Sequence, residues 1–242
     1  MSERTGSPVP ADSARDVGRA TGRVVAELER LIVSGELLPG QPIRQVLMAE
    51  RLGVSRLPIR EALRHLTAEG LVQHEHNVGY TVARLQQSDF DQIYLMRAAL
   101  EPELLRSLPT FSEAALAEVS ALGDRVARAA EEGDVLAMRL HNNAFHFAIF
   151  ERSPLNLVVA EVRRLWTLAM PYHAAYLYDP AARERVVSEH DQMIEALARH
   201  DNERLVALMD EHRRGGETST GIMLRGTRTG AARPGDPAVP EE

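Results

Sequence analysis

The stretch that decides the fold of the first domain is Gly53-Val54-Ser55-Arg56-Leu57-Pro58-Ile59-Arg60-Glu61-Ala62-Leu63. It predicts a tight turn at Gly53 followed by a helix that Ser55 caps, because a serine hydroxyl accepts a hydrogen bond from the first turn. Pro58 falls within that turn, where its missing donor is not required. Gly70 ends the helix, and Leu71 makes the apolar contact that usually follows.

Arginines recur every four residues along this helix, at Arg56, Arg60 and Arg64, and therefore project from one face. We expect the apolar positions to pack on other faces: Leu57, Ile59, Ala62, Leu63 and Leu66. A helix-turn-helix that carries a guanidinium stripe suits the major groove of DNA, where arginine reads guanine or holds phosphate. The alternative is a solvated helix face, but the turn, the cap and the following hairpin favour DNA binding.

The residues on either side complete a small domain. An apolar stripe predicts a helix over about 21–34, and a short helix follows over 44–52, with Val46, Leu47 and Leu52 facing the core. Two short strands, 71–74 and 80–83, flank a loop containing Asn77 and Gly79, residue types that accept the positive φ angles of a hairpin. His74 and His76 are expected on the surface of this hairpin.

These motifs resemble the winged-helix domain of the GntR superfamily of bacterial transcription regulators over residues 21–85. The motifs that carry the resemblance are Leu38-Pro39-Gly40, Leu52-Gly53-Val54-Ser55-Arg56, Pro58-Ile59-Arg60-Glu61-Ala62-Leu63, Glu69-Gly70-Leu71-Val72 and Gly79. Where members of the family often have a basic or polar residue before the turn, this chain has Val46, and we expect Arg44 to substitute. The resemblance implies these DNA-binding residues: Arg44, Ser55, Arg56, Pro58, Arg60, Arg64 and, in the wing, Gly79.

The composition bounds the rest of the chain. A length of 242 residues suits two domains rather than one winged helix. The chain has no cysteine, no apolar run long enough to cross a membrane and no apolar core of a signal peptide, so we expect a cytoplasmic protein without disulfides. All 28 basic residues are arginine, which we read as GC-rich coding rather than function.

The net charge of −7 is unevenly distributed. Residues 17–84 carry nine arginines against seven acids, a net charge of +2, whereas residues 85–225 carry fifteen against twenty-two, a net charge of −7. The acidic balance therefore belongs to the second domain. A weakly basic module can still bind DNA when its charges share one face, and a homodimer doubles them.

The predicted fold class is mainly α, an N-terminal winged helix-turn-helix followed by a C-terminal all-α bundle. We expect a disordered arm over 1–18, the DNA-binding domain over 19–85, an effector-binding and dimerisation domain over 88–224, and a disordered tail over 226–242. Ser88 is expected to cap the first helix after the linker, and Pro102 to kink or break it. The helices of the second domain are predicted at 88–106, 112–132, 134–152, 154–177, 180–199 and 202–224.

Three of the nine histidines fall on apolar helix faces. His146, His190 and His212 share their faces with apolar residues on three different helices and therefore point into the bundle. Neutral imidazoles that converge in a bundle are natural ligands for a divalent first-row metal. The spacing alone gives a metal site and three unrelated core histidines equal weight. The other histidines are expected at surfaces or helix ends.

Further motifs resemble the all-helical FCD domain of the FadR-like branch of that superfamily, over residues 88–224. They are Tyr94-x-x-Arg97-x-x-Leu100-Glu101, Asn142-x-x-Phe145-His146, Glu189-His190 with Ile194-x-Ala196, and Met209-x-x-His212. Many members hold a metal there with one Asp and three histidines. The resemblance implies the ligands Asn142, His146, His190 and His212, and an ion of the Zn, Ni or Mn class. Asn142 stands where the Asp is usual and brings no charge, so we expect weaker metal binding. The same histidines could instead bind an organic effector without metal.

Arg97 matches a family arginine in the first helix of this domain. A guanidinium inside a bundle needs an anionic partner, which an effector carboxylate or Glu101, one turn on, could equally supply. Arg164, Tyr172 and Tyr176 could line the same pocket, and Trp166 is expected in the core.

Together these observations predict a ligand-responsive transcription regulator and not an enzyme. We expect a repressor that binds a double-stranded operator as a homodimer and responds to a small carboxylate or sugar acid, at a metal site. Two alternatives are a regulator that responds to the metal itself and, with less support, a metal-dependent enzyme. The operator, the effector, the metal and the sign of regulation do not follow from the sequence.

Overall fold

The computed structural model describes residues 11–173 and 176–226 of the chain. The chain divides into two compact units, the first ending at Arg84 and the second starting at Leu85. Of the arm expected over 1–18, residues 1–10 lie outside the described residues, whereas residues 11–18 belong to a helix; of the tail expected over 226–242, residues 227–242 lie outside them. Each unit is built around its own buried apolar residues.

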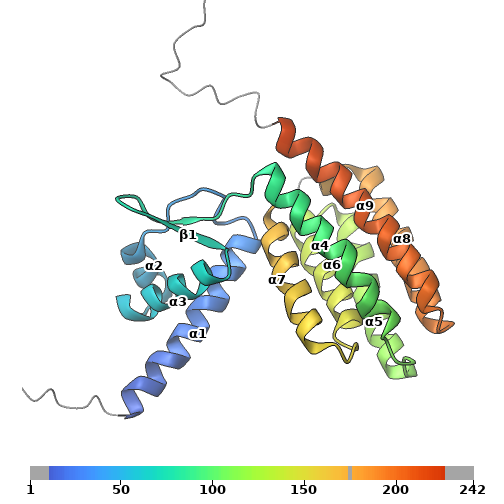
Figure 1. Cartoon of the computed structure of the whole chain (residues 1–242), viewed down its shortest axis with the longest axis horizontal. Coiled ribbons are helices and arrows are strands. Elements are labelled where there is room, and N and C mark those ends of the chain that lie inside the picture. Colours follow the sequence, from blue (N-terminus) through green and yellow to red (C-terminus); the bar gives the residue numbers. More distant parts are fainter. Residues whose placement is uncertain (1–10, 174–175, 227–242) are drawn as a thin grey trace, which may run out of the picture. The chain divides into compact units, whose positions relative to one another are not determined.

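The first unit consists of three helices and a two-stranded antiparallel sheet (Figure 1). Its elements are α1 (Ala11–Val33), α2 (Gln45–Leu52), α3 (Arg56–Ala68), β1 (Val72–Glu75) and β2 (Gly79–Val82). Helix α1 packs against α3, and α2 against α3. In the sheet, Val72 is opposite Val82 and Glu75 is opposite Gly79, so the tip of the hairpin lies between residues 75 and 79.

The turn chemistry of this unit follows the sequence pattern. Gly53 ends α2 with a φ angle of 62°, and Gly70 follows α3 with a φ angle of 83°. The Leu71 N–H donates to the Leu66 carbonyl at 3.0 Å, which closes the end of α3, and Leu71 is buried. Asn77 and Gly79 have φ angles of 68° and 91°, which the hairpin loop requires.

Two expectations for the first unit are wrong. Helix α1 begins at Ala11 rather than near Thr21, because residues 11–20 contain no apolar stripe from which the sequence pattern could predict a helix. Val46, Leu47 and Leu57 do not pack inward: they are 42%, 52% and 42% exposed. The buried face of α3 is narrower than expected, because Pro58 occupies the inward position beside Ile59.

The second unit is a bundle of helices (Figure 1). Its elements are α4 (Gln87–Arg106), α5 (Glu113–Glu132), α6 (Val135–Phe150), α7 (Asn156–His173), the short 3-10 helix η1 (Tyr176–Tyr178), α8 (Pro180–Ala198) and α9 (Asn202–Gly226). Helix α4 packs on α7 and α9, α5 packs on α6 and α8, and α8 packs on α9. Trp166 is buried in the core as expected, at 2% exposure.

Two local expectations for α4 are corrected. Its N-cap is Gln86 rather than Ser88, and the Asp89 carboxylate accepts a hydrogen bond from the Gln86 N–H at 2.8 Å. Of the kink or break expected at Pro102, the break is absent, because the helix continues to Arg106. One lost backbone hydrogen bond near the end of a helix is outweighed by the burial of Leu104 and Leu105, both 0% exposed.

Candidate functional site

Three helices bring His146, His190 and His212 together inside the second unit. The three side chains come from α6, α8 and α9 and are 0%, 1% and 7% exposed. One ring nitrogen from each lies within 4.8 Å of the others, and the His146 and His212 Nε2 atoms are 3.2 Å apart. His190 is held by Phe145, whose ring stacks on it at 4.0 Å between centroids. The predicted convergence of these histidines is therefore present.

The geometry and the protonation state of this cluster suit a metal ion. Two nitrogens bound to one tetrahedral ion at 2.0–2.1 Å lie about 3.3 Å apart, close to the separation of the two Nε2 atoms. Burial lowers the pKa of His190 well below its ordinary value, with the neighbouring His212 acting in the same direction, so its imidazole is neutral and able to coordinate. The cluster could hold a metal ion.

His190 of the cluster and the nearby Asn142 have buried polar atoms for which the described residues offer no partner. Three buried atoms have no hydrogen-bonding partner among the described residues: the two ring nitrogens of His190 and Oδ1 of Asn142. Buried polar atoms are nearly always bonded, so such orphans mark a place where a ligand is expected. Asn142 lies one turn before His146 on α6, in position to present its carbonyl oxygen.

A carboxylate orients one of the histidines from behind. His212 Nδ1 donates to Glu189 Oε2 at 2.6 Å, and Glu189 also accepts from Arg185 at 3.0 Å. Burial alone raises the pKa of Glu189, but the hydrogen bond and charge of His212, together with Arg185, outweigh it and hold that pKa below its usual value. An imidazole that donates from Nδ1 presents its Nε2 lone pair to the cluster, the arrangement common around metal-binding histidines.

Arg97 is buried beside the cluster and is paired within the chain. Its Nε donates to Glu101 Oε1 at 2.6 Å, and Glu101 accepts a second bond from Trp166 Nε1 at 2.8 Å. Its guanidinium carbon lies 4.2 Å from the centroid of the Trp166 ring. Of the two partners weighed for Arg97, the structure contains Glu101. The guanidinium still lines a small hollow that it shares with Asn142 and His212.

The space in that hollow is limited. Its volume is about 20 Å³, and Tyr94, Trp166, Arg213 and Gly216 complete its lining. This is room for about one water molecule or one metal ion. An organic acid can enter only when the side chains around it move.

The first unit presents a basic helix face. Arg56, Arg60 and Arg64 are all exposed on α3, and Leu57 lies on the same face, three residues before Arg60. Glu61 lies between them, 3.5 Å from the Arg60 guanidinium and 3.8 Å from that of Arg64. Exposed ion pairs of this kind are weak, so both arginines can exchange this partner for phosphate or a base.

Three other predicted DNA-binding residues have different surroundings. Ser55 is the N-cap of α3 by its backbone, but its hydroxyl makes no capping hydrogen bond, because the third residue of the helix is Pro58 and has no N–H. Pro58 itself is buried, so it cannot contact DNA directly. Arg44, at the N-cap of α2, is exposed. In the hairpin, His74 packs on Tyr80, with ring centroids 4.6 Å apart.

Comparison with known families agrees with both units. Residues 20–82 match the family described as bacterial regulatory proteins, gntR family, and residues 92–215, half of the chain, match the FCD domain. The protein belongs to the GntR family of regulators with an FCD domain. It is a DNA-binding transcription regulator.

Relatives of known name support this assignment. The HTH-type transcriptional regulator McbR of Escherichia coli is 27% identical over 76% of this chain and 84% of its own length. The transcriptional repressor GlaR of the same organism is 28% identical over 76% of this chain and 88% of its length. The solved structure of E. coli McbR/YncC superposes with a TM-score of 0.76 at 25% identity, covering 86% of this chain and 98% of that one.

Two residues expected in the effector pocket of this GntR-family protein lie elsewhere. Arg164 is exposed on α7 and bonds Glu161, one turn earlier. Tyr172 accepts a hydrogen bond from the Leu85 N–H at 2.8 Å and packs near Phe90, so it fastens the start of the second unit to α7. Helix periodicity predicted on which face of the helix each residue lies, but not which residues of other helices lie next to it. The side chain of Tyr176 lies outside the described residues.

One charged residue of α6, Arg139, is buried at 4% exposure although no sequence motif includes it. Its signal was its spacing: it precedes Asn142 by three residues and His146 by seven, and therefore shares their helix face. A charged residue at such a position is rare unless it has a partner.

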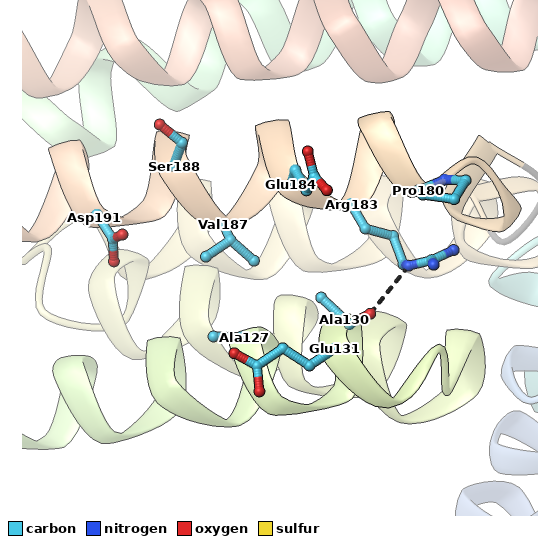
Figure 2. A pocket seen from close by; sticks show the side chains of 9 residues that line it. All are labelled: Ala127, Ala130, Glu131, Pro180, Arg183, Glu184, Val187, Ser188 and Asp191. Atoms are coloured by element: carbon cyan, nitrogen blue, oxygen red, sulfur yellow. Dashed lines mark hydrogen bonds between the residues drawn. The ribbon is translucent and has the colours of Figure 1, made fainter.

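A wider groove lies between α5 and α8 and has a different character. Figure 2 shows its lining, an apolar floor that includes Ala127, Ala130 and Val187 beneath the carboxylates of Glu131, Glu184 and Asp191. Its volume is about 420 Å³. Arg183, the one cation in its lining, donates to the Ala130 carbonyl at 3.1 Å and to carbonyls of η1. Acidic walls disfavour an acid, so this groove is not the effector site we consider.

No helix in the described ranges is both long and apolar enough to cross a membrane.

Proposed function

We propose that this GntR-family regulator is a repressor whose second unit binds a small carboxylate over a divalent metal ion. The ligands of the ion are His146, His190 and His212, with the Asn142 carbonyl oxygen as a fourth. The observation that carries this proposal is the convergence of three buried imidazoles beside two kinds of orphaned polar atom. The ion supplies a positive charge and open coordination positions to an incoming acid.

The donor set narrows the choice of ion. Imidazole nitrogens with one carbonyl oxygen and no thiolate suit Zn, Ni or Mn rather than Cu(I) or an iron–sulfur centre. The site lacks a coordinating carboxylate, because Asn142 is neutral. We therefore expect metal affinity below that of a site in which an Asp occupies this position.

Arg97 provides the second contact for the acid. Its guanidinium faces the shared hollow while Glu101 neutralises its charge through Nε. Arg97 would exchange other contacts that it makes within the chain for the acid, since a guanidinium can bind a carboxylate with two parallel hydrogen bonds. An acid would thus be held between the metal ion and Arg97.

The first unit supplies the DNA contacts. Arg56, Arg60 and Arg64 line the exposed face of α3 that would enter the major groove, and the exposed side chain of Leu57 suits a thymine methyl group. Arg44 and the Ser55 hydroxyl would contact phosphates, and Gly79 would bring the hairpin close to the minor groove. We place the protein in the cytoplasm, as a homodimer on a pseudo-palindromic operator.

Regulation requires that the acid bind two arrangements of the protein with different affinity. The hollow of about 20 Å³ gives a reason for such a difference, since an acid enters only when neighbouring side chains move. We expect the rearranged form to release DNA, so that the acid relieves repression.

A thermal-shift screen of the purified protein tests this proposal. Small 2-hydroxy acids and sugar acids are added with and without a chelator. A ligand that binds only the folded state raises the melting temperature in a concentration-dependent manner. Stabilisation that disappears with chelator supports metal-assisted binding of the acid. Stabilisation that is indifferent to chelator removes the metal from the proposal, and no stabilisation by any acid contradicts the effector class.

Paired substitutions separate the two units. Arg60→Ala should weaken binding to the upstream DNA of the protein's own gene and make the salt dependence less steep by about one unit of log–log slope, without changing acid binding. Arg97→Ala should weaken acid binding and leave DNA binding intact. If both variants fold and either one alters both properties equally, this division of roles is wrong.

The small hollow also favours a second candidate, in which the metal ion itself is the signal. Its volume of about 20 Å³ fits an ion without an acid. In that case a chelator alone would change DNA affinity. An enzymatic role is not part of either candidate, and turnover of a carboxylic acid or ester lost in His146→Ala would contradict both.

A further inference from the structure

Arg139, on α6, is a buried cation without a counter-ion. Its side chain is 4% exposed, and in the ranges 11–173 and 176–226 it has no hydrogen bond and no ion pair. Burial lowers the pKa of this guanidinium, and the phenol of Tyr178 in η1 acts in the opposite direction. Placing an unpaired guanidinium in a protein interior is costly.

Two other arginines of the same unit are buried, and each has a carboxylate partner. Arg97 donates to Glu101 at 2.6 Å, and Arg213 bonds Asp210 and lies 3.8 Å from Glu101. Both are buried like Arg139, at 3% and 7% exposure against its 4%. The bundle therefore supplies a carboxylate to each of these two arginines, but among the described residues it supplies none to Arg139.

The position of Arg139 relates it to the histidine cluster. It lies on the face of α6 that carries Asn142 and His146, seven residues before His146. Seven residues of helix rise by about 10 Å, and helical side chains lean toward the N-terminus, so the guanidinium lies at some distance from the imidazole. Its own chain already covers Arg139, so a second subunit cannot reach it to provide the missing charge.

We propose that Arg139 binds a second anionic group of the effector, which is therefore a dicarboxylic acid. The inference rests on the proposed function: one carboxylate binds at the metal ion and Arg97, and the other binds at Arg139. The separation along α6 requires several carbon–carbon bonds between the two carboxylates. This narrows the effector class from small acids to elongated diacids.

The test compares matched acids on the full-length, metal-loaded protein by titration calorimetry. Each pair has the same carbon chain with or without the terminal carboxylate: 2-hydroxybutanoate and malate, 2-hydroxyhexanoate and 2-hydroxyadipate, 2-hydroxyoctanoate and 2-hydroxysuberate. We expect at least one longer diacid to bind about tenfold or more tightly than its monoacid, since a charged hydrogen-bonded pair in a buried site contributes that much. In Arg139→Met that advantage should vanish, with the monoacid unaffected.

Two further variants make the result specific. Arg128→Met removes the same charge from an exposed position on α5 and should preserve the preference for the diacid. Arg139→Lys keeps the charge without the planar fork and should retain part of the preference. A loss of preference in Arg128→Met that equals the loss in Arg139→Met would overturn the inference, because it would reflect net charge alone.

The stability of the ligand-free protein gives an independent reading. Replacing an unpaired buried guanidinium by methionine removes a desolvated charge, so Arg139→Met should melt at the same temperature as the parent protein or higher. A melting temperature lowered by several degrees would show that Arg139 has a structural partner and would overturn the inference.

The outcomes distinguish this inference from the proposed function. If acids bind in a metal-dependent manner but mono- and diacids bind alike, only the role of Arg139 fails. If the parent protein binds neither kind of acid, the proposed effector class fails, and the inference fails with it.

Discussion

Glu189 controls which nitrogen His212 presents to its neighbours. Its carboxylate accepts from His212 Nδ1 at 2.6 Å and is itself held by Arg185. Glu189→Gln would leave the imidazole in place but remove the charge that fixes its tautomer. We expect metal affinity to fall by about 10- to 100-fold, as for other residues that support a metal ligand. Competition with a chromophoric chelator measures this directly.

The control for this prediction lies on the same helix. Glu184 is exposed on α8, at the rim of the groove in Figure 2, and Glu184→Gln removes the same charge away from the histidines. Its metal affinity should equal that of the parent protein. Equal losses in the two variants would show that Glu189 acts only through the net charge of the helix.

The buried state of His190 predicts how stability responds to pH. The pKa of His190 in the folded protein lies well below 6.5. Below about pH 6.5, His190 therefore binds a proton in the unfolded chain but not in the folded one. Chelator-treated protein should therefore lose stability as the pH falls below about 6.5, by up to about 1.4 kcal/mol per pH unit for this one group. Glu189, whose folded pKa is lowered, adds a loss in the same direction below about 4.5.

Denaturant titrations from about pH 7.5 to about pH 5 would measure how the free energy of unfolding changes with pH, over the range in which a solvent-exposed histidine titrates. His190→Gln should flatten this dependence, whereas His200→Gln, at the exposed end of α8, should not. A parent protein whose stability is constant over this interval would contradict the buried neutral state of His190.

At the scale of single residues, the spacing of apolar positions predicted whether a side chain points into the bundle better than it predicted which residues that side chain contacts. His146, His190 and His212 were placed correctly because each shares a face with apolar residues, which the bundle buries. Arg164 and Tyr172 were misplaced because periodicity does not identify the residues that face a side chain. Arg139 was missed for the opposite reason, since a lone arginine within a helix matches no motif until its burial is known.

The N-terminus of α3 differs physically from that of an ordinary helix, and this can be measured. Replacing a capping serine by alanine commonly costs about 1 kcal/mol. The Ser55 hydroxyl makes no capping bond, whereas the Ser112 hydroxyl accepts from the Ala115 N–H at 3.2 Å. Ser112→Ala should therefore destabilise the second unit by about 1 kcal/mol, and Ser55→Ala should leave the stability of the first unit nearly unchanged.

Calorimetry of the full chain measures the stability of the two variants, and a DNA titration measures their affinity for the operator. Ser55→Ala should weaken DNA binding although it does not destabilise α3, since its free hydroxyl faces outward. A stability loss in Ser55→Ala as large as that in Ser112→Ala would mean that Ser55 caps the helix after all.

The exposed face of α3 predicts that each half-site of the operator contains a thymine whose methyl group contacts the protein. Leu57 is 42% exposed beside Arg60, and an apolar side chain in the major groove favours the methyl group of thymine. Replacing thymine by deoxyuridine, position by position in the half-site, should weaken binding at one position in the parent protein. In Leu57→Ser the same replacement should have no effect. Uniform sensitivity along the half-site would argue against a contact by Leu57.

Elements were easier to predict from the sequence than their ends. Glycine at Gly53, Gly70 and Gly79 marks positive φ angles that few other residues accept, so the turns of the first unit could be located. Helix starts were harder to predict, as at Ala11 and at the N-cap Gln86, because the sequence pattern there did not mark the first residue of the helix. The inward or outward position of Leu57 depended on Pro58, which packs inward and so leaves its neighbour on the surface.

At the scale of the molecule, the two units differ in charge and in task. The basic balance lies in the first and the acidic balance in the second, so the weak overall acidity of the chain conceals a basic helix face. The composition could show this division, but not the histidine cluster, which forms only when α6, α8 and α9 pack together. Only the second unit contains the proposed metal ligands.

This division predicts how metal binding should appear in an amide hydrogen-exchange experiment. A ligand that binds the native state of one unit stabilises that unit by an amount that grows with its free concentration. Addition of Zn²⁺ to chelator-treated protein should therefore slow amide hydrogen exchange in α6, α8 and α9 and leave exchange in the core of α3 unchanged. In His146→Ala the metal should protect neither unit.

The same experiment in the presence of operator DNA tests whether the units communicate. If the acid relieves repression, DNA and acid must each weaken the binding of the other by the same factor. Exchange in the second unit should then be slowed less by the acid when operator is bound, and operator affinity should fall by an equal factor when the acid is saturating. Protection that is indifferent to DNA would mean that the second unit binds its ligand without regulating the first.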